Sequence, residues 1–258
     1  MAEQARGELP PSETRDRVMN SASYIIGAAL SMQGWSGSLD WSKRLVNEGV
    51  LTTPELISSF SRVKRLDFLP DEQKPDEGYD WPLQVGQAQT NSQPSLVGRM
   101  LELLQPRRGH AILDVGSGSG WTTALLASVA GKRGRVIGTE RVPELVEFAK
   151  GNLVKYDLPT ARVELTESGL GMPSQGPYNR ILVSAHMLEE WVPELSSQLS
   201  PRGGIMVAPI VTEANHGKSG YNQHVAVITR HGANFATATA MEEVGFVPLI
   251  HDGAVGQS

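Results

Sequence analysis

The sequence predicts an α/β fold with a mostly parallel sheet and helices on both of its faces. Three observations support this prediction. Short apolar runs alternate with helical segments after residue 110, as in strands that are joined by crossover helices. The first of these runs leads directly into a glycine-rich turn at 116–120 and then into a helix. Two further strand-like segments follow between residues 223 and 247, and we expect them to pair antiparallel at the C-terminal edge of the sheet.

Each element follows from its local pattern of apolar residues and breakers. The predicted parallel strands are Ala111–Val115, Arg135–Thr139, Ala161–Leu165, Arg180–Ser184 and Gly204–Val211, and the antiparallel pair is Gln223–Thr229 and Thr237–Val247. The predicted helices of this part are Ser95–Leu104, Thr122–Val129, Val142–Tyr156 and Trp191–Leu199. Together they form the domain that we predict over residues 95–258.

The segment before residue 95 is predicted to be mostly helical. Residues 1–17 are polar and are expected to form a flexible tail. Helical patterning follows at 18–32, 41–50 and 54–63, and Thr53 before Pro54 suits the start of the last helix. Four prolines between residues 67 and 94 favour extended or looped chain. We therefore predict a helical region that ends in a loop, over residues 18–94.

Composition limits the classes of function. With a net charge of −5, the chain has no overall positive field that would attract nucleic acid. Two basic clusters, Arg62 to Arg65 and Arg107 to Arg108, are interpreted as solvated surface. No cysteine is present, which excludes disulfides, thiolate nucleophiles and cysteine zinc sites. The histidines lack the spacing of a helical metal pair, so no metal is predicted.

The expected location is the cytoplasm. No apolar run approaches the roughly 18 residues of a membrane span, and the first residues lack the apolar core of a signal peptide. At 258 residues the chain is long enough for a substantial core. We expect a monomer, although the sequence leaves the oligomeric state open.

The turn at 116–120, called the glycine loop below, has the composition of a cofactor-binding loop. Glycine tolerates both the positive φ of such a turn and the close approach of a ligand to the backbone. The next apolar run ends at Glu140, 24 residues after Gly116, where a carboxylate can accept hydrogen bonds from both ribose hydroxyls. This arrangement is typical of a Rossmann-like sheet.

The glycine spacing favours one cofactor. A dinucleotide loop needs a third glycine at position 121, and this chain has Trp121 there. The pattern G-x-G-x-G suits S-adenosylmethionine, which carries no phosphate, and Asp114 is expected to attract its cationic methionine end. An ordinary turn between a strand and a helix is the alternative. The predicted cofactor contacts from this part of the chain are Asp114, Gly116, Ser117, Gly118, Gly120 and Glu140.

A second polar segment, Val85–Pro94, precedes the first helix of the domain and is called the substrate loop below. It is dense in small polar side chains. We expect it to lie over the cofactor pocket if the helix that follows packs beside the first strand. The residues alone also allow a simple capped loop, with Ser92 or Gln93 as the helix cap and Pro94 in the first turn.

The chain resembles the protein L-isoaspartyl O-methyltransferase family from about residue 45 to residue 250. The family's loop I-G-x-G-Q-T-I-S-x-P matches the substrate loop without a gap, and its F-V-P-L segment matches Phe246–Leu249. Further segments similar to the family's motifs are Val63–Pro70, Tyr79–Leu83, Leu113–Gly120, Val142–Leu145, Gly176–Ile181 and, displaced by one inserted residue, Gln198–Gly204. The resemblance implies a Rossmann-like class I S-adenosylmethionine-dependent methyltransferase fold.

The resemblance also implies an activity and a site. The expected reaction is methylation of the free α-carboxylate of L-isoaspartyl residues in damaged proteins and peptides. Ser92 would be the active-site residue, which orients the carboxylate, and Thr90, Asn91 and Gln93 would contact the substrate. The turn after the third strand, with Glu167 and Ser168, would lie near the adenine.

Several positions depart from the family pattern. Asn91 replaces an aliphatic residue, Ala88 replaces a glycine, Asn179 replaces an aspartate, and Gly245 stands where an arginine is frequent. These departures leave two alternatives open. One is a methyltransferase of the same fold that acts on a different carboxylate, in a natural-product peptide or another protein. The other is a cofactor-binding protein without turnover, which docks a partner on the helices at 18–66.

Overall fold

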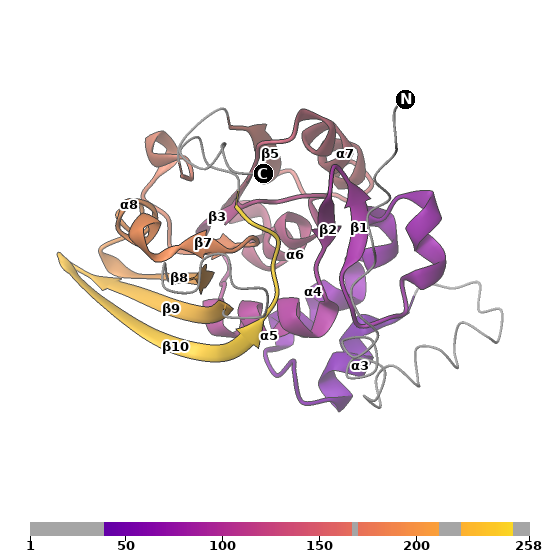
Figure 1. Ribbon diagram of the computed structural model, residues 1–258, viewed down its shortest axis with the longest axis horizontal. Coiled ribbons are helices and arrows are strands. Elements are labelled where there is room, and N and C mark those ends of the chain that lie inside the picture. Colours follow the sequence, from indigo (N-terminus) through magenta and orange to yellow (C-terminus); the bar gives the residue numbers. More distant parts are fainter. Residues whose placement is uncertain (1–38, 167–169, 212–222, 250–258) are drawn as a thin grey trace, which may run out of the picture.

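The computed structural model describes residues 39–166, 170–211 and 223–249, and its centre is an eight-stranded sheet (Figure 1). The strands of this sheet are β3 (Ala111–Val115), β4 (Arg135–Glu140), β5 (Ala161–Leu165), β6 (Arg180–Val183), β7 (Met187–Leu188), β8 (Arg202–Val211), β9 (Gln223–His231) and β10 (Asn234–Val244). The tail at 1–17 and the predicted helical segment at 18–32 lie outside the described residues.

The topology confirms the predicted fold class. The strands follow the order β10-β9-β8-β6-β3-β4-β5, with β7 paired to β8. All pairs from β5 to β8 are parallel, whereas β8, β9 and β10 pair antiparallel. Figure 1 shows β9 and β10 at the end of the sheet that is opposite to β5. Every predicted strand of this sheet is present, and among its described strands the two-residue β7 (Met187–Leu188) is the one that was not predicted.

Helices cover the sheet on both faces. The described α-helices are α3 (Trp41–Asn47), α4 (Pro54–Arg62), α5 (Pro94–Leu104), α6 (Trp121–Ala130), α7 (Pro143–Leu153) and α8 (Val192–Ser196). Successive residues of a strand point to opposite faces: on β3, Ile112 packs with α3 to α7, whereas Leu113 packs with α8. The predicted helix Trp191–Leu199 is shorter in the structure: a 3₁₀ turn, η5 (Glu189–Trp191), takes its first residue, and α8 ends at Ser196.

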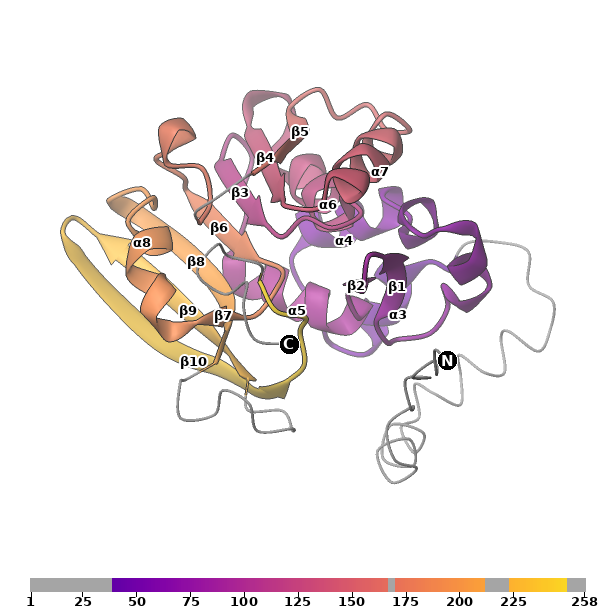
Figure 2. The ribbon, with the colours of Figure 1, turned by 45° about the horizontal axis from the view of Figure 1, so that its top comes forward.

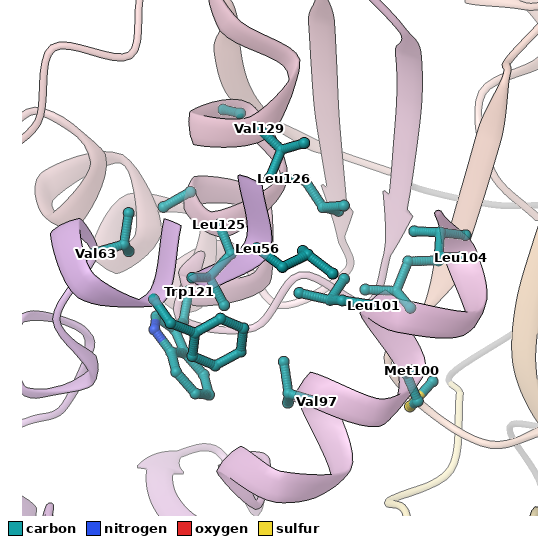
Figure 3. Close-up of a cluster of buried hydrophobic side chains, with 14 of the residues drawn as sticks. Leu56, Val63, Val97, Met100, Leu101, Leu104, Trp121, Leu125, Leu126 and Val129 are labelled. Carbon is teal, nitrogen blue, oxygen red and sulfur yellow. The ribbon is translucent and has the colours of Figure 1, made fainter. Parts of the chain in front are cut away.

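The N-terminal helices share the core of the sheet domain. Figure 3 shows apolar side chains of α4, α5 and α6 that point toward one another, among them Leu56, Leu101 and Leu125. Phe60 meets Trp121 edge to face at 5.8 Å between ring centroids. Burial of this many large apolar side chains is the dominant stabilising term for such a layer. The helices at 41–62 are thereby fixed against α6, which begins at the glycine loop.

The segment at 67–94 contains more regular structure than the prediction of extended or looped chain. It holds the 3₁₀ helix η2 (Asp71–Asp76) and a separate antiparallel hairpin of β1 (Leu83–Gly86) and β2 (Gln89–Asn91). The helix η1 (Arg65–Phe68) lies just before them. In Figure 2 this hairpin lies on the side of the molecule away from β9 and β10, and Leu83 and Val85 of β1 pack with Leu145 of α7. The substrate loop is therefore carried on a hairpin.

The turn of this hairpin is strained at a position where the family has glycine. Gln87 and Ala88 link β1 to β2 with φ angles of 52° and 55°, as in a type I′ turn. A side chain in this left-handed region costs roughly 1–2 kcal/mol. We predict that Ala88→Gly raises the free energy of unfolding by about 0.5–1 kcal/mol, after the entropic cost of glycine in the unfolded chain is subtracted.

Urea denaturation of the two proteins measures this difference. The control is Ala236→Gly, at an exposed position of β10, where the same change is expected to destabilise by about 0.5–1 kcal/mol. A loss of stability in both variants would contradict the strain at Ala88.

Among the described residues, no helix has the length and apolar character that a membrane crossing requires.

Candidate active site

The glycine loop lies at the carboxyl end of β3 and has the geometry that the sequence predicts. Its three glycines have φ angles of 74° (Gly116), 52° (Gly118) and 87° (Gly120). A Cβ atom on Gly120 would come within 3.1 Å of the Ala149 Cβ, so this glycine allows α6 and α7 to approach closely. A Cβ on Gly118 would meet nothing within 4 Å, because this residue borders a cavity.

Glu140 ends β4 beside the glycine loop. Its Oε2 accepts a hydrogen bond from the Gly118 N–H at 2.9 Å, and its Oε1 accepts one from the Arg141 N–H at 2.7 Å. A third N–H, of Val142, donates to Oε1 at 3.1 Å. The carboxylate is 8% exposed and lines the cavity. Glu140 therefore stabilises the glycine loop and at the same time presents acceptor atoms to a ligand.

Asp114 lies beneath the glycine loop and is fully buried. Its carboxylate accepts hydrogen bonds from the hydroxyls of Thr122 and Thr123 at 2.7 and 2.6 Å and of Ser184 at 3.0 Å. Burial raises the pKa of Asp114 above its usual value, while these three hydroxyls oppose the rise. Its hydrogen bonds with the two threonines fix the start of α6 against β3. The predicted attraction of Asp114 for the cationic end of a cofactor stays a prediction.

Two adjoining cavities lie above the carboxyl ends of β3 and β4. The larger measures about 600 Å³ and is open to solvent, and the smaller measures about 280 Å³. Both are lined by Thr90, Gly116, Gly118 and Ser184. The substrate loop thus lies on the same side of the sheet as the glycine loop. This relative placement is what the sequence predicted for the two loops.

The predicted substrate contacts have different surroundings. Ser92 lines the smaller cavity, and Thr90 lines both. Gln93 donates hydrogen bonds from Nε2 to Asp80 at 3.2 Å and to Ser95 at 3.0 Å, so its amide holds the loop to its neighbours.

Asn91 is only 4% exposed, and both of its polar side-chain atoms have partners within the protein. Its Oδ1 accepts from Arg65, and its Nδ2 donates to Ser119. Asn91 also lines the smaller cavity, and its predicted contact with the substrate stays a prediction.

The interpretation of the cluster Arg62 to Arg65 as solvated surface is wrong for Arg65. Its side chain is fully buried and donates to carbonyl oxygens of Glu77, Tyr79 and Trp81 at 3.3, 2.8 and 2.7 Å. Two longer bonds reach the carbonyls of Asn91 and Ser92, at 3.4 and 3.3 Å. Burial lowers the pKa of Arg65 to about 9, against the attraction of Glu77 and Asp80. Arg65 remains charged at neutral pH, and its hydrogen bonds to Asn91 and Ser92 hold the substrate loop in place.

A wall of the larger cavity comes from Val247, Pro248 and Leu249, which were not among the predicted site residues. Gln223 holds this segment, because it accepts from the Phe246 N–H at 2.7 Å and donates to the Phe246 carbonyl at 3.1 Å. The matching F-V-P-L motif was the sequence signal that could have identified this wall.

The remaining predicted cofactor contacts belong to the turn that follows β5. Glu167 and Ser168 lie outside the described residues. Thr166, just before them, lines the larger cavity, and its N–H donates to the Glu140 carbonyl at 2.9 Å. No group of acidic residues and histidines that could hold a metal occurs within the described ranges.

Two hydroxyls near the cavities have no partner within the protein. Among the described residues, the buried Ser117 Oγ and Thr139 Oγ1 form no hydrogen bond, although such atoms are usually satisfied. Ser117 lines the smaller cavity and Thr139 the larger. The walls of both cavities therefore contain polar groups close to where a ligand would lie.

Comparison with known proteins gives a consistent result. A family model described as protein-L-isoaspartate(D-aspartate) O-methyltransferase matches residues 40–254. The protein-L-isoaspartate O-methyltransferase of Methanococcoides burtonii is 37% identical over 199 residues, which are 77% of this chain and 93% of that protein. The enzyme of the same name from Aeropyrum pernix is 42% identical over 171 residues, or 66% of this chain and 65% of its own.

A solved structure has the same fold. It is a Plasmodium falciparum protein described as a protein-L-isoaspartate O-methyltransferase, in complex with S-adenosyl-L-homocysteine. The match has a TM-score of 0.67 and 22% identity, and it covers 84% of this chain and all of the other. With the family model matched over most of its length, the chain belongs to the protein-L-isoaspartate(D-aspartate) O-methyltransferase family.

Proposed function

We propose that the protein transfers a methyl group from S-adenosylmethionine to the free α-carboxylate of L-isoaspartyl residues in damaged proteins and peptides. One observation carries the proposal: the hydroxyl-rich substrate loop and the glycine loop line the same pair of cavities. A carboxylate held by the first loop would therefore lie next to a cofactor held by the second. Membership of the family supports the same reaction.

The residues of the larger cavity fit the proposed cofactor. S-adenosylmethionine supplies a methyl group on a sulfonium, which is open to displacement by an oxygen nucleophile. Glu140 would accept the ribose hydroxyls, and the backbone at Gly116 and Gly118 would lie against the ligand. The lining of this cavity combines apolar side chains, such as Leu170 and Leu249, with a few polar groups, which is usual for small-molecule sites.

The acceptor needs alignment more than activation. A free carboxyl titrates near pH 4, so it is already anionic at neutral pH and needs no general base. Thr90 and Ser92 would donate hydrogen bonds to it and hold one oxygen in line with the methyl group. The methyl ester would then cyclise without the enzyme to a succinimide, which reopens partly to normal aspartate.

One assay tests the reaction. Tritiated methyl incorporation is measured into an isoaspartyl peptide and into its normal-aspartyl twin, with release of methanol at alkaline pH. We expect incorporation into the isoaspartyl peptide alone. Incorporation into neither peptide, while the cofactor still binds, would overturn the proposal and favour a different carboxylate acceptor or a protein without turnover.

Ser92→Ala is predicted to lower kcat/KM for the isoaspartyl peptide by about 10- to 150-fold, the equivalent of the 1.5–3 kcal/mol of a hydrogen bond to a charged group. Cofactor affinity should change little, because Ser92 lies on the substrate loop. Steady-state kinetics and calorimetry with S-adenosylhomocysteine give the two values. Ser61→Ala, on the exposed side of α4, is the control. Unchanged kcat/KM in Ser92→Ala would remove Ser92 from the reaction.

We also propose that the enzyme works as a cytoplasmic monomer without a nucleic acid or membrane partner. The net charge of −5 supports the absence of a nucleic-acid partner, because a phosphate backbone favours a basic surface. Damaged proteins and peptides are then its only macromolecular partners.

A further inference from the structure

A chain of buried hydrogen bonds joins the substrate loop to the glycine loop. Arg65 Nε donates to Asn91 Oδ1 at 2.9 Å, and Asn91 Nδ2 donates to Ser119 Oγ at 3.2 Å. The three residues are 0%, 4% and 3% exposed. Because solvent does not compete for these bonds, a break would leave buried groups unpaired.

The orientation of the Asn91 amide follows from its neighbours. A guanidinium group has only donors, so the atom that faces Arg65 must be the amide oxygen. The amide nitrogen then faces Ser119, whose hydroxyl can accept. An aliphatic residue, which the family's loop motif has at this position, could form neither bond. The connection is thus a property of this chain and not of the family motif.

Ser119 is placed to respond to the cofactor. It lies between Gly118, which borders both cavities, and Gly120, and its carbonyl accepts from Asn152 Nδ2 at 3.0 Å. The positive φ angles on either side give this loop more freedom than side-chain-bearing residues would have. A ligand that packs against Gly118 restricts that freedom and fixes the Ser119 hydroxyl.

We propose that Asn91 is a positioning residue that couples cofactor binding to the substrate loop: a cofactor that orders the glycine loop strengthens the bond that Asn91 donates to Ser119, and thereby orders the neighbouring Ser92. The proposal rests on the proposed function for the identity of the two ligands. Coupling of this kind is reciprocal, so an acceptor peptide raises cofactor affinity by the same factor. One hydrogen bond corresponds to a factor of about 2 to 10.

The test measures the affinity of an isoaspartyl peptide with and without saturating S-adenosylhomocysteine, in the parent protein, Asn91→Ile, Ser119→Ala and the double variant. In each protein, the affinity for the peptide with S-adenosylhomocysteine is divided by the affinity without it. We expect this ratio to fall about 2- to 10-fold in each single variant. It should fall no further in the double variant, because both changes break one connection. Asn47→Ile, at the exposed end of α3, is the control and should keep the parent ratio.

Two outcomes would overturn the coupling. If Asn91→Ile weakens binding of the peptide equally with and without S-adenosylhomocysteine, Asn91 acts on peptide binding alone. If the effects of the single variants multiply, the two residues act separately.

A second measurement does not depend on the acceptor. S-adenosylhomocysteine should slow amide hydrogen exchange across residues 83–93 in the parent, and slow it less in Asn91→Ile. Equal protection in both proteins would also overturn the coupling. If the protection by S-adenosylhomocysteine is smaller in Asn91→Ile while the parent methylates no isoaspartyl peptide, the proposed function fails and the coupling stands.

Discussion

Glu140→Ala is expected to weaken S-adenosylhomocysteine binding by about 10- to 150-fold, which corresponds to the loss of 1.5–3 kcal/mol from a charge-assisted hydrogen bond. The carboxylate is the acceptor that we assign to the ribose hydroxyls, and it also accepts from the Gly118 N–H. Its removal takes away a ligand contact and loosens the loop that lies against the ligand.

Isothermal titration calorimetry measures this change. Glu144→Ala is the matched control, because Glu144 lies in the first turn of α7 and is exposed. Its variant should bind the cofactor like the parent. If Glu140→Ala and the parent bind with equal affinity, the ribose assignment is wrong.

Arg65→Met is expected to lower the free energy of unfolding by about 3–5 kcal/mol, as when one partner of a buried charged network is removed. Methionine fills part of the volume but donates no hydrogen bond. The carbonyls of Tyr79 and Trp81 would lose the Arg65 donors that they now have at 2.8 and 2.7 Å. The buried Asn91 Oδ1 would lose its Arg65 donor at 2.9 Å, and an unsatisfied buried acceptor is costly.

Chemical denaturation at neutral pH gives the two stabilities. Arg62→Met is the control, since Arg62 is exposed at the end of α4, and surface changes of this kind are usually within about 0.5 kcal/mol of zero. A loss no larger in Arg65→Met than in Arg62→Met would show that the buried guanidinium is not needed for stability.

The periodicity of the sequence was sufficient to predict the sheet and most helices around it. Strands such as β3 and β4 are short, mostly apolar segments that lead to Gly116 and to Glu140, so local pattern and burial agree. The hairpin of β1 and β2 was missed because its strands are short and its turn uses Gln87 and Ala88, where a glycine would have been the usual signal.

The site was predicted where the chemistry is local to a motif. The glycine loop and Glu140 lie within one βαβ unit, and that unit fixes their distance. The surroundings of Asp114, Asn91 and Arg65 depend on tertiary contacts that no local pattern encodes. Arg65 looked like part of an exposed basic cluster, because its partners are backbone carbonyls, which are present at every position of a sequence.

The walls of the larger cavity come from segments that are far apart in the chain, with Thr90 on one side and Val247 to Leu249 on another. A molecule that fills it would bridge the hairpin near the helical layer and the segment that follows β10. Its binding energy would then oppose unfolding of the whole chain, by about 2.7 kcal/mol at a ligand concentration one hundred times Kd. Supply of the methyl donor would in this way also set how resistant the repair enzyme is to heat.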